Sequence, residues 1–155
     1  MSTLVEKLSK VQKELKAPKN QRNNFGNYNY RSCEDILEAV KPHLDGTSVT
    51  VSDKIVVVNA GEKARVYVEA TVTFTDGTEK IEVTASARES ETKKGMDDAQ
   101  ITGSASSYAR KYALNGLFLI DDTKDSDATN THGKGESVKS PVKTKAKVVT
   151  KEKSK

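Results

Sequence analysis

Residues 19–32 combine the two kinds of side chain that bind single-stranded nucleic acid. The segment reads KNQRNNFGNYNYRS and carries three of the chain's eight aromatic residues between basic ones. Cationic groups attract phosphates, and flat rings stack on unpaired bases. We therefore expect Tyr28 and Tyr30 to stack on or wedge between bases, and Arg31 to pair with a phosphate. The alternative is an irregular loop that packs its rings on the core, because ordinary proteins also bury tyrosine.

A second set of polar side chains follows one face of a predicted helix over residues 97–122. At 100° per residue, Gln100, Ser104, Ser107 and Lys111 form a stripe at one-turn spacing. Amide, hydroxyl and ammonium donors on one surface are suited to tracking phosphates. The other candidates for phosphate contact lie near this stripe or just before the helix: Arg88, Lys93, Lys94 and Arg110.

Each cationic candidate also has an ordinary structural interpretation. Arg110 and Lys111 can instead form ion pairs with acidic residues such as Glu38 or Glu69. The loop at 91–96 can equally be a solvated connection, because two aspartates follow its lysines and weaken the attraction for phosphate.

Motifs for nucleotide hydrolysis and covalent catalysis are missing from the sequence. There is no G-x-x-x-x-G-K-[ST] motif, which argues against an ATP-driven strand-exchange motor, and neither histidine stands with a nucleophile. The acidic pairs at 97–98 and 121–122 leave a metal-dependent nuclease as a hypothesis. About 20 helical residues would separate these pairs by roughly 30 Å, however. We therefore expect no catalytic residue, no metal site, no cofactor and no enzymatic activity.

Charge and composition place limits on the class of protein. The net charge is +4, but the segment from Lys134 onward holds eight lysines against two glutamates, so the rest is slightly acidic. A single cysteine, Cys33, suits a reducing compartment. No apolar run approaches the length of a membrane span, and no signal-peptide pattern occurs. We expect a soluble, unsecreted protein without membrane contact.

Hydrophobic periodicity predicts an α+β fold. Residues 3–16 form an amphipathic helix that Pro18 ends, and residues 33–44 form a second helix capped by Ser32. Strands follow with alternating or β-branched patterns and a strong turn signal at Asp76-Gly77. The predicted strands, Val49–Val58, Ala64–Phe74 and Glu79–Glu89, make a three-stranded antiparallel meander with one wet face.

The stretch over residues 97–122 is predicted to be one long helix followed by a short apolar exit, and the helix is expected to pack on this sheet. Asp97 and Gln100 resemble a capping box at its start. One face carries Ile101, Ala105, Tyr108 and Tyr112, which predicts that both tyrosines pack in the core. A parallel line of small residues includes Gly103, whose helix-interior cost of about 1 kcal/mol indicates a need for space.

The sequence divides into a folded part and a tail. Residues 1–122 form the predicted binding domain, and residues 123–155 are Lys-rich, lack a core pattern and are predicted to be disordered. The order of helices and strands is compatible with several nucleic-acid modules, of which the double-stranded-RNA-binding domain is the nearest competitor. Layout alone does not decide function.

Three blocks of the chain carry a family resemblance. They lie within residues 14–42 (ELKAPKN…FGNYNYRSCEDILEAVKP), 85–89 (ASARE) and 93–125 (KKGMDDAQITGSASSYARKYALNGLFLIDDTKD). In these blocks, roughly within residues 5–127, the chain resembles the ERF (essential recombination function) family of bacteriophage single-strand annealing proteins. The last block is long and is far more specific than a short motif.

The resemblance implies an activity and a manner of assembly. It implies an ATP-independent protein of the bacterial host's cytoplasm that coats single-stranded DNA, anneals complementary strands in phage recombination and forms rings or filaments. It also implies a β-β-β-α core and, as a further partner, a single-strand-binding protein of host or phage. Longer members carry a sizeable C-terminal region, whereas a short Lys-rich tail follows residue 127 here.

Overall fold

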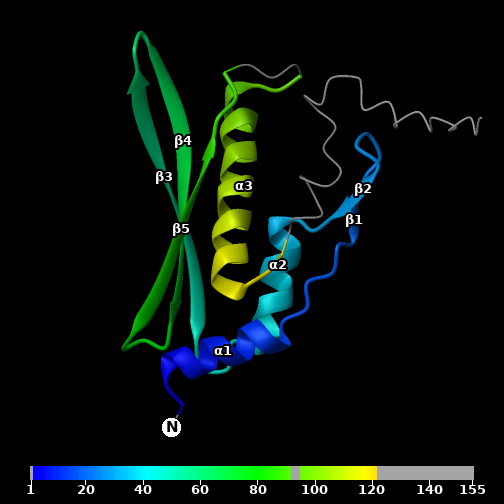
Figure 1. The fold of residues 1–155 in the computed structure, drawn as a ribbon, viewed down its shortest axis with the longest axis vertical. Helices are drawn as coiled ribbons and strands as arrows, with labels where there is room; N and C mark the ends of the chain where they lie inside the picture. The colour runs from blue at the N-terminus through cyan, green and yellow to red at the C-terminus, as the bar shows by residue number, and fades with distance from the viewer. Residues whose placement is uncertain (1, 92–94, 122–155) are drawn as a thin grey trace, which may run out of the picture.

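The computed structural model describes residues 2–91 and 95–121, and these form an α+β fold. The predicted three-stranded meander and the long helix after it are present (Figure 1). Within these ranges no helix is long and apolar enough to cross a membrane. The predicted disordered tail, 123–155, lies outside them. In chain order the elements are α1 (Leu4–Glu14), β1 (Gln21–Asn23), β2 (Tyr28–Tyr30), α2 (Cys33–Val40), the 3₁₀ turn η1 (Lys41–His43), β3 (Ser48–Ala60), β4 (Lys63–Thr75), β5 (Lys80–Arg88) and α3 (Asp98–Phe118).

The sheet is the predicted antiparallel meander, in the order β3-β4-β5. Its register pairs Val51 with Val72 and Val72 with Val83, so the three side chains share one face. Asp76 accepts hydrogen bonds from two backbone N–H groups in the β4–β5 turn, and Gly77 takes a φ of 92° there. A residue without a Cβ adopts that conformation without strain, so the turn signal in the sequence is confirmed.

Helix α3 covers one face of the sheet, and the core lies between them (Figure 1). Phe74 of β4 and Phe118 of α3 meet edge to face, with ring centroids 6.4 Å apart. Such pairs stabilise a core beyond the area that they bury. α1 and α2 close one end of this core through the buried residues Leu4, Leu8, Val11, Ile36 and Val40.

The N-terminal helices differ in their ends from the prediction. The first helix covers Leu4–Glu14 rather than residues 3–16. The second is Cys33–Val40, followed by a 3₁₀ turn, instead of one helix over 33–44. Pro42 explains this difference, because proline has no N–H for the i→i−4 hydrogen bond of an α-helix.

The ends of α3 are set by local hydrogen bonds. The predicted capping box is present: Gln100 N–H donates to Asp97 Oδ1 at 2.8 Å, and Asp97 N–H donates to Gln100 Oε1 at 3.0 Å. The helix stops at Phe118, where the predicted apolar exit begins, because Leu119 turns left-handed with a φ of 56°. The N–H of Leu119 then donates to the carbonyl of Asn115.

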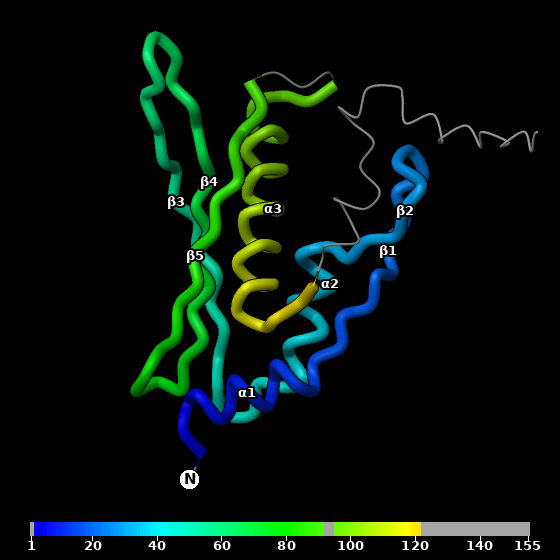
Figure 2. Tube along the Cα trace, viewed as in Figure 1, coloured from blue at the N-terminus to red at the C-terminus, as the bar shows by residue number. Residues whose placement is uncertain are grey.

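Part of the segment at 19–32 is regular, although its sequence shows no strand pattern. β1 and β2 form a short antiparallel hairpin that pairs Gln21 with Tyr30 and Asn23 with Tyr28. It lies on the side of α3 that faces away from the sheet (Figure 2). Strands of three residues are too short for alternation to be visible in the sequence. Gly26 lies against the Tyr28 ring, because a Cβ there would lie 2.3 Å from Cε1 of that ring.

Candidate nucleic-acid interface

The face of α3 that carries Tyr108 and Tyr112 is open, so the prediction that these rings pack in the core is wrong. Their exposed fractions are 51% and 49%. Ala105, which the sequence places on the same face, is buried as predicted, and Ala109 and Ala113 are buried with it against the sheet. The hydrophobic pattern by itself does not distinguish tyrosine from alanine when it assigns the inward face of a helix. The close approach of helix to sheet selects the small side chains for the inside and leaves the large rings outside.

Gly103 also differs from its predicted role within the fold. A Cβ built there would meet no atom within 4 Å, so no neighbour in the described ranges requires its space. The close approach occurs at Gly116 instead, where a Cβ would lie 3.3 Å from Cγ1 of Val83.

Four tyrosines from two separate elements face one cavity. Tyr28 and Tyr30 of the hairpin have ring centroids 6.1 Å apart, and so do Tyr108 and Tyr112 of α3. The cavity between the two pairs measures about 400 Å³, and we call it the tyrosine cavity. Its volume is in the lower part of the range of small-molecule pockets, so a single planar ring system fits its size.

Local contacts hold the hairpin side of the tyrosine cavity in place. Asn23 Nδ2 donates to the Tyr28 hydroxyl at 3.0 Å, and the Tyr28 ring lies over the Gly26 backbone. Lys111 Nζ of α3 lies 5.8 Å from the centroid of the Tyr30 ring, within cation–π range. This contact bridges the two walls of the cavity.

The environment of the tyrosine cavity favours the neutral form of Tyr108. The pKa of Tyr108 is raised, first by burial and then by the nearby phenols of Tyr28, Tyr112 and Tyr30. At neutral pH the Tyr108 hydroxyl keeps its proton and remains a hydrogen-bond donor.

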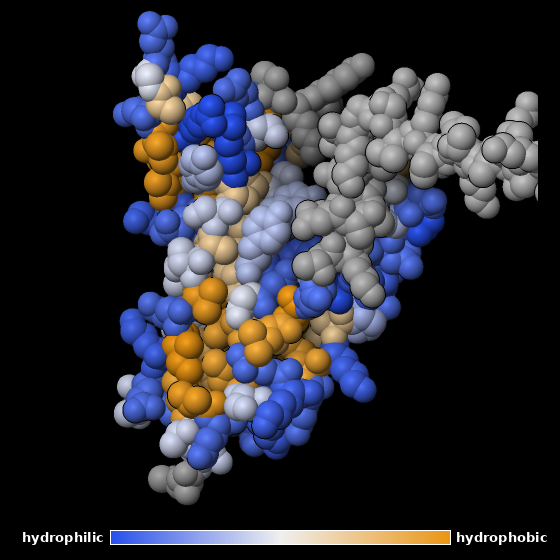
Figure 3. Space-filling view, viewed as in Figure 1, coloured by the Kyte–Doolittle hydropathy of each residue, from blue (hydrophilic) through white to orange (hydrophobic). Residues whose placement is uncertain are grey.

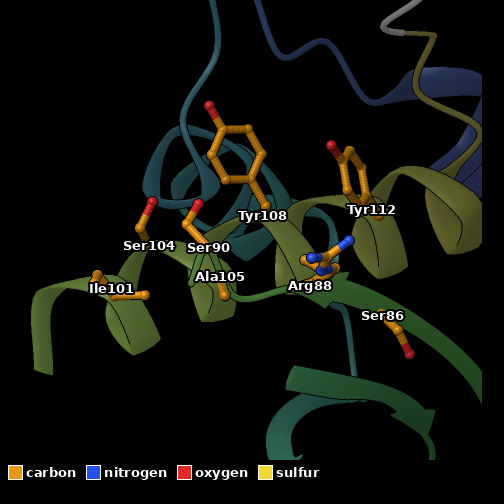
Figure 4. A pocket seen from close by; sticks show the side chains of 9 residues that line it. Ser86, Arg88, Ser90, Ile101, Ser104, Ala105, Tyr108 and Tyr112 are labelled. Atoms are coloured by element: carbon orange, nitrogen blue, oxygen red, sulfur yellow. The ribbon is translucent and has the colours of Figure 1, made fainter. Parts of the chain in front are cut away.

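A second hollow adjoins the tyrosine cavity across α3. It measures about 380 Å³ and lies between α3 and the end of β5, where Arg88 contributes to its lining. Figure 4 shows Tyr108 and Tyr112 projecting from the same side of α3, with Ser104 one turn earlier. Ser104, Tyr108 and Tyr112 line both hollows. We call the two hollows together the α3 groove.

The structure brings most of the predicted contact residues to the α3 groove. Arg88 lines the hollow beside β5, although its side chain also approaches Glu91 at 3.7 Å. Gln100 lies at the start of the helix, where its amide belongs to the capping box. Lys93 and Lys94 lie outside the described residues. The predicted residues that line the tyrosine cavity are Tyr28, Tyr30, Arg31, Ser104, Ser107 and Lys111.

Two of the predicted arginines have partners within the protein. Arg31 is buried, and its guanidinium donates to the carbonyls of Ala17 at 2.6 Å and Asp121 at 3.2 Å. Arg110 makes a bidentate contact with Asp53, with Nε–Oδ1 and Nη2–Oδ2 distances of 3.0 Å. Arg31 thus joins the base of the hairpin to the segment after α1 and to the segment after α3, and Arg110 joins α3 to β3. The acidic partner of Arg110 is therefore neither of those predicted.

The ion pair at Asp53 has a clear electrostatic signature. Burial acts to raise the pKa of Asp53, but hydrogen bonds from Arg110 and Ser106 outweigh it and hold the pKa below its usual value. The same contact raises the pKa of Arg110. The pair is thus ionised at neutral pH.

Phe25 is a further exposed aromatic residue, which is not among the predicted contact residues. It lies at the tip of the hairpin and is 92% exposed. Its position after two asparagines and before a glycine indicates an exposed turn, because such segments form turns. Metal chemistry has no corresponding candidate, since the described ranges contain no group of three His, Cys, Asp or Glu residues placed to hold an ion.

Comparisons with known proteins give a consistent family. The model of the family described as "ERF superfamily" matches residues 4–155. The chain is 59% identical over 121 residues to the essential recombination function protein of Salmonella phage P22. This alignment covers 78% of the present chain but 57% of that relative, so the chain spans little more than half the relative's length. No solved structure matches the chain significantly.

Proposed function

Because this chain belongs to the ERF superfamily, we propose that it binds single-stranded DNA and anneals complementary strands in phage recombination, without ATP. Residues 1–122 carry the binding site in this proposal, and the Lys-rich segment 123–155 adds nonspecific attraction to nucleic acid. A single-strand-binding protein of host or phage is a further proposed partner. No covalent step is required.

The observation that carries the proposal is the α3 groove. It presents aromatic rings in its centre and a cation on either side, Lys111 toward the hairpin and Arg88 toward β5. Proteins that hold single strands without sequence preference combine such cations with stacking rings. Arg31 and Arg110 act as supports of this groove in the proposal, because their guanidinium groups already bind protein oxygens.

Tight binding requires several copies of the chain. One protomer offers few contacts to a strand, and an array multiplies them through effective concentration. The outer part of the β3–β4 hairpin supplies a surface for a second copy: Ile55, Val57 and Val58 are 53%, 57% and 45% exposed. Figure 3 shows apolar side chains on the projecting β3–β4 arm. β3 is also an edge strand, and exposed apolar edges favour pairing with another chain.

An annealing assay tests this function. Two complementary oligonucleotides are mixed with the protein, without nucleotide or metal, and duplex formation is followed with an intercalating dye. Accelerated duplex formation supports the proposal, and a rate equal to the spontaneous rate refutes it. Competition between single-stranded DNA and duplex RNA distinguishes the alternative RNA-binding module, in which the RNA competes better. Loss of the oligonucleotide only when Mg²⁺ is present would instead indicate a nuclease.

A further inference from the structure

The tyrosines of this chain are concentrated at one place. The sequence has five tyrosines and no tryptophan, and four of the five line the tyrosine cavity. The fifth, Tyr67, lies on β4 next to Val68, whose side chain is buried against α3, so Tyr67 points to the opposite face of the sheet. Rings gathered from a hairpin and a helix far apart in the sequence are not explained by core packing, because the two helix tyrosines are half exposed.

The arrangement has the features of a receptor for a flat aromatic group. One tyrosine pair comes from the hairpin and the other from α3, and both line the cavity, so an inserted ring meets aromatic side chains from both elements. Ser104 and Ser107 add hydroxyl groups to the lining, and these both donate and accept hydrogen bonds. Lys111 adds a positive charge beside Tyr30. The serine hydroxyls can donate to or accept from the edge of any base, and the Lys111 ammonium group can bind the phosphate attached to it.

We propose that the tyrosine cavity of each protomer takes one nucleobase of the bound strand, turned out of the row of bases that pairs with the complementary strand. This inference rests on the proposed binding of single-stranded DNA and adds what the cavity itself holds. Lys111 binds the phosphate next to the inserted base, and the α3 groove carries the adjoining backbone toward Arg88. The cavity volume of about 400 Å³ limits the occupancy to one base.

The proposal has a mechanical consequence for annealing. A base held in each protomer keeps the strand in register with the protein array, while the bases between two protomers remain free to test a complement. Because stacking is insensitive to base identity, the array binds any sequence. The base held by a protomer must leave the cavity before it can pair, so it is the last base of the stretch bound by that protomer to join the duplex.

Intrinsic tyrosine fluorescence tests the inference directly, since the chain has no tryptophan. The full-length protein is titrated with a thymidine oligonucleotide and with an abasic oligomer of the same length and charge. Binding of both is measured separately by the anisotropy of an end label. We expect the thymidine oligonucleotide to quench most of the tyrosine emission and the bound abasic oligomer to leave it nearly unchanged. Equal quenching by the two, or binding without quenching, overturns the inference.

Matched variants show which tyrosines account for the quenching of the fluorescence. Tyr108→Leu changes a half-exposed side chain and should weaken binding of the thymidine oligonucleotide about tenfold, with little effect on the abasic oligomer. Tyr67→Phe should retain both the affinity and the quenching. Phe25→Ala removes an exposed ring of the same hairpin that does not line the cavity, and should retain the quenching. If Tyr67→Phe or Phe25→Ala abolishes the quenching, the base is held elsewhere.

Photochemical crosslinking gives an independent readout. An oligonucleotide with 5-iododeoxyuridine is irradiated in the complex, and the modified residue is identified by mass spectrometry. Crosslinks to the tyrosines of the cavity support the inference, whereas crosslinks confined to Tyr67 or Phe25 refute it. If neither oligonucleotide binds in the anisotropy measurement, the proposed function itself fails, which is a distinct result.

Discussion

Gly26→Ala should displace one wall of the tyrosine cavity without unfolding the protein. The new Cβ would lie 2.3 Å from Cε1 and 2.7 Å from Cδ1 of Tyr28. Carbon atoms in contact prefer about 3.5–4.0 Å, so the ring has to move by about 1 Å or more. This movement also disrupts the 3.0 Å hydrogen bond from Asn23 to the Tyr28 hydroxyl. The contact atoms belong to a side chain, so the backbone of the hairpin can remain.

The size of the effect follows from the loss of one stacking partner. Stacking contributes about 1–3 kcal/mol per base, which corresponds to about 5- to 150-fold in Kd. Because the hairpin lies at the surface, the free energy of unfolding should change by less than about 1 kcal/mol. Affinity is measured by anisotropy with a short thymidine oligonucleotide, and stability is measured by thermal unfolding.

A second glycine variant separates affinity from stability. Gly77 lies in the β4–β5 turn, away from the groove, with a φ of 92°. Gly77→Ala should lower stability by about 1–2 kcal/mol because the left-handed region is strained for alanine, yet it should leave the Kd unchanged. An unchanged Kd in Gly26→Ala would refute the assignment of Tyr28 as a base contact. An equal loss of affinity in both variants would show that the effect follows stability rather than the ring.

Three further outcomes follow from the structure. Asp53→Asn removes the ion pair with Arg110, whose side chain is 38% exposed, so screening limits the loss to about 1 kcal/mol at neutral pH. The folded-state pKa of Asp53 is lowered, so the ion pair stabilises the fold above the unfolded pKa of Asp53, and this stabilisation is lost as the pH falls through the folded-state pKa. In urea unfolding, the difference in stability between variant and wild type should therefore disappear in acid. A difference that does not change with pH would contradict the reasoning. Gly103→Ala should raise the stability by about 1 kcal/mol in thermal unfolding, because its Cβ meets no atom within 4 Å; a lower stability would reveal a close neighbour. Ile55→Asp with Val57→Asp should reduce the multimer size in light scattering, and an unchanged mass would exclude the β3–β4 arm as the contact between copies.

The pattern of side chains predicted the sheet well because its strands are long and their turns are marked. The alternation in β4 is confirmed from Val68 onward by burial of Val68, Ala70, Val72 and Phe74, whereas Ala64 near the start of the strand is exposed. The capping box at Asp97 and Gln100 was also visible, since it depends on residues three positions apart. Local rules sufficed here because each interaction lies within one element or one turn.

Long-range geometry escaped the same reasoning. The α3 face toward the sheet was misassigned because its phase depends on how closely the helix approaches β4 and β5, which selects alanines over tyrosines. The partner of Arg110 is Asp53, 57 positions away, and no spacing rule connects them. The hairpin was overlooked because each of its strands has three residues.

By itself, the sequence determined which side chains form the candidate binding surface, namely the tyrosines of residues 28–30 and the stripe on the helix, and which family the chain belongs to. Only the tertiary structure decided that Tyr108 and Tyr112 join them around one cavity, and that the guanidinium groups of Arg31 and Arg110 bind oxygens of the protein itself. The physical reason is that composition and period describe one element at a time. A cavity between the hairpin and α3 exists only after folding has brought together two elements that lie about 80 residues apart in the sequence.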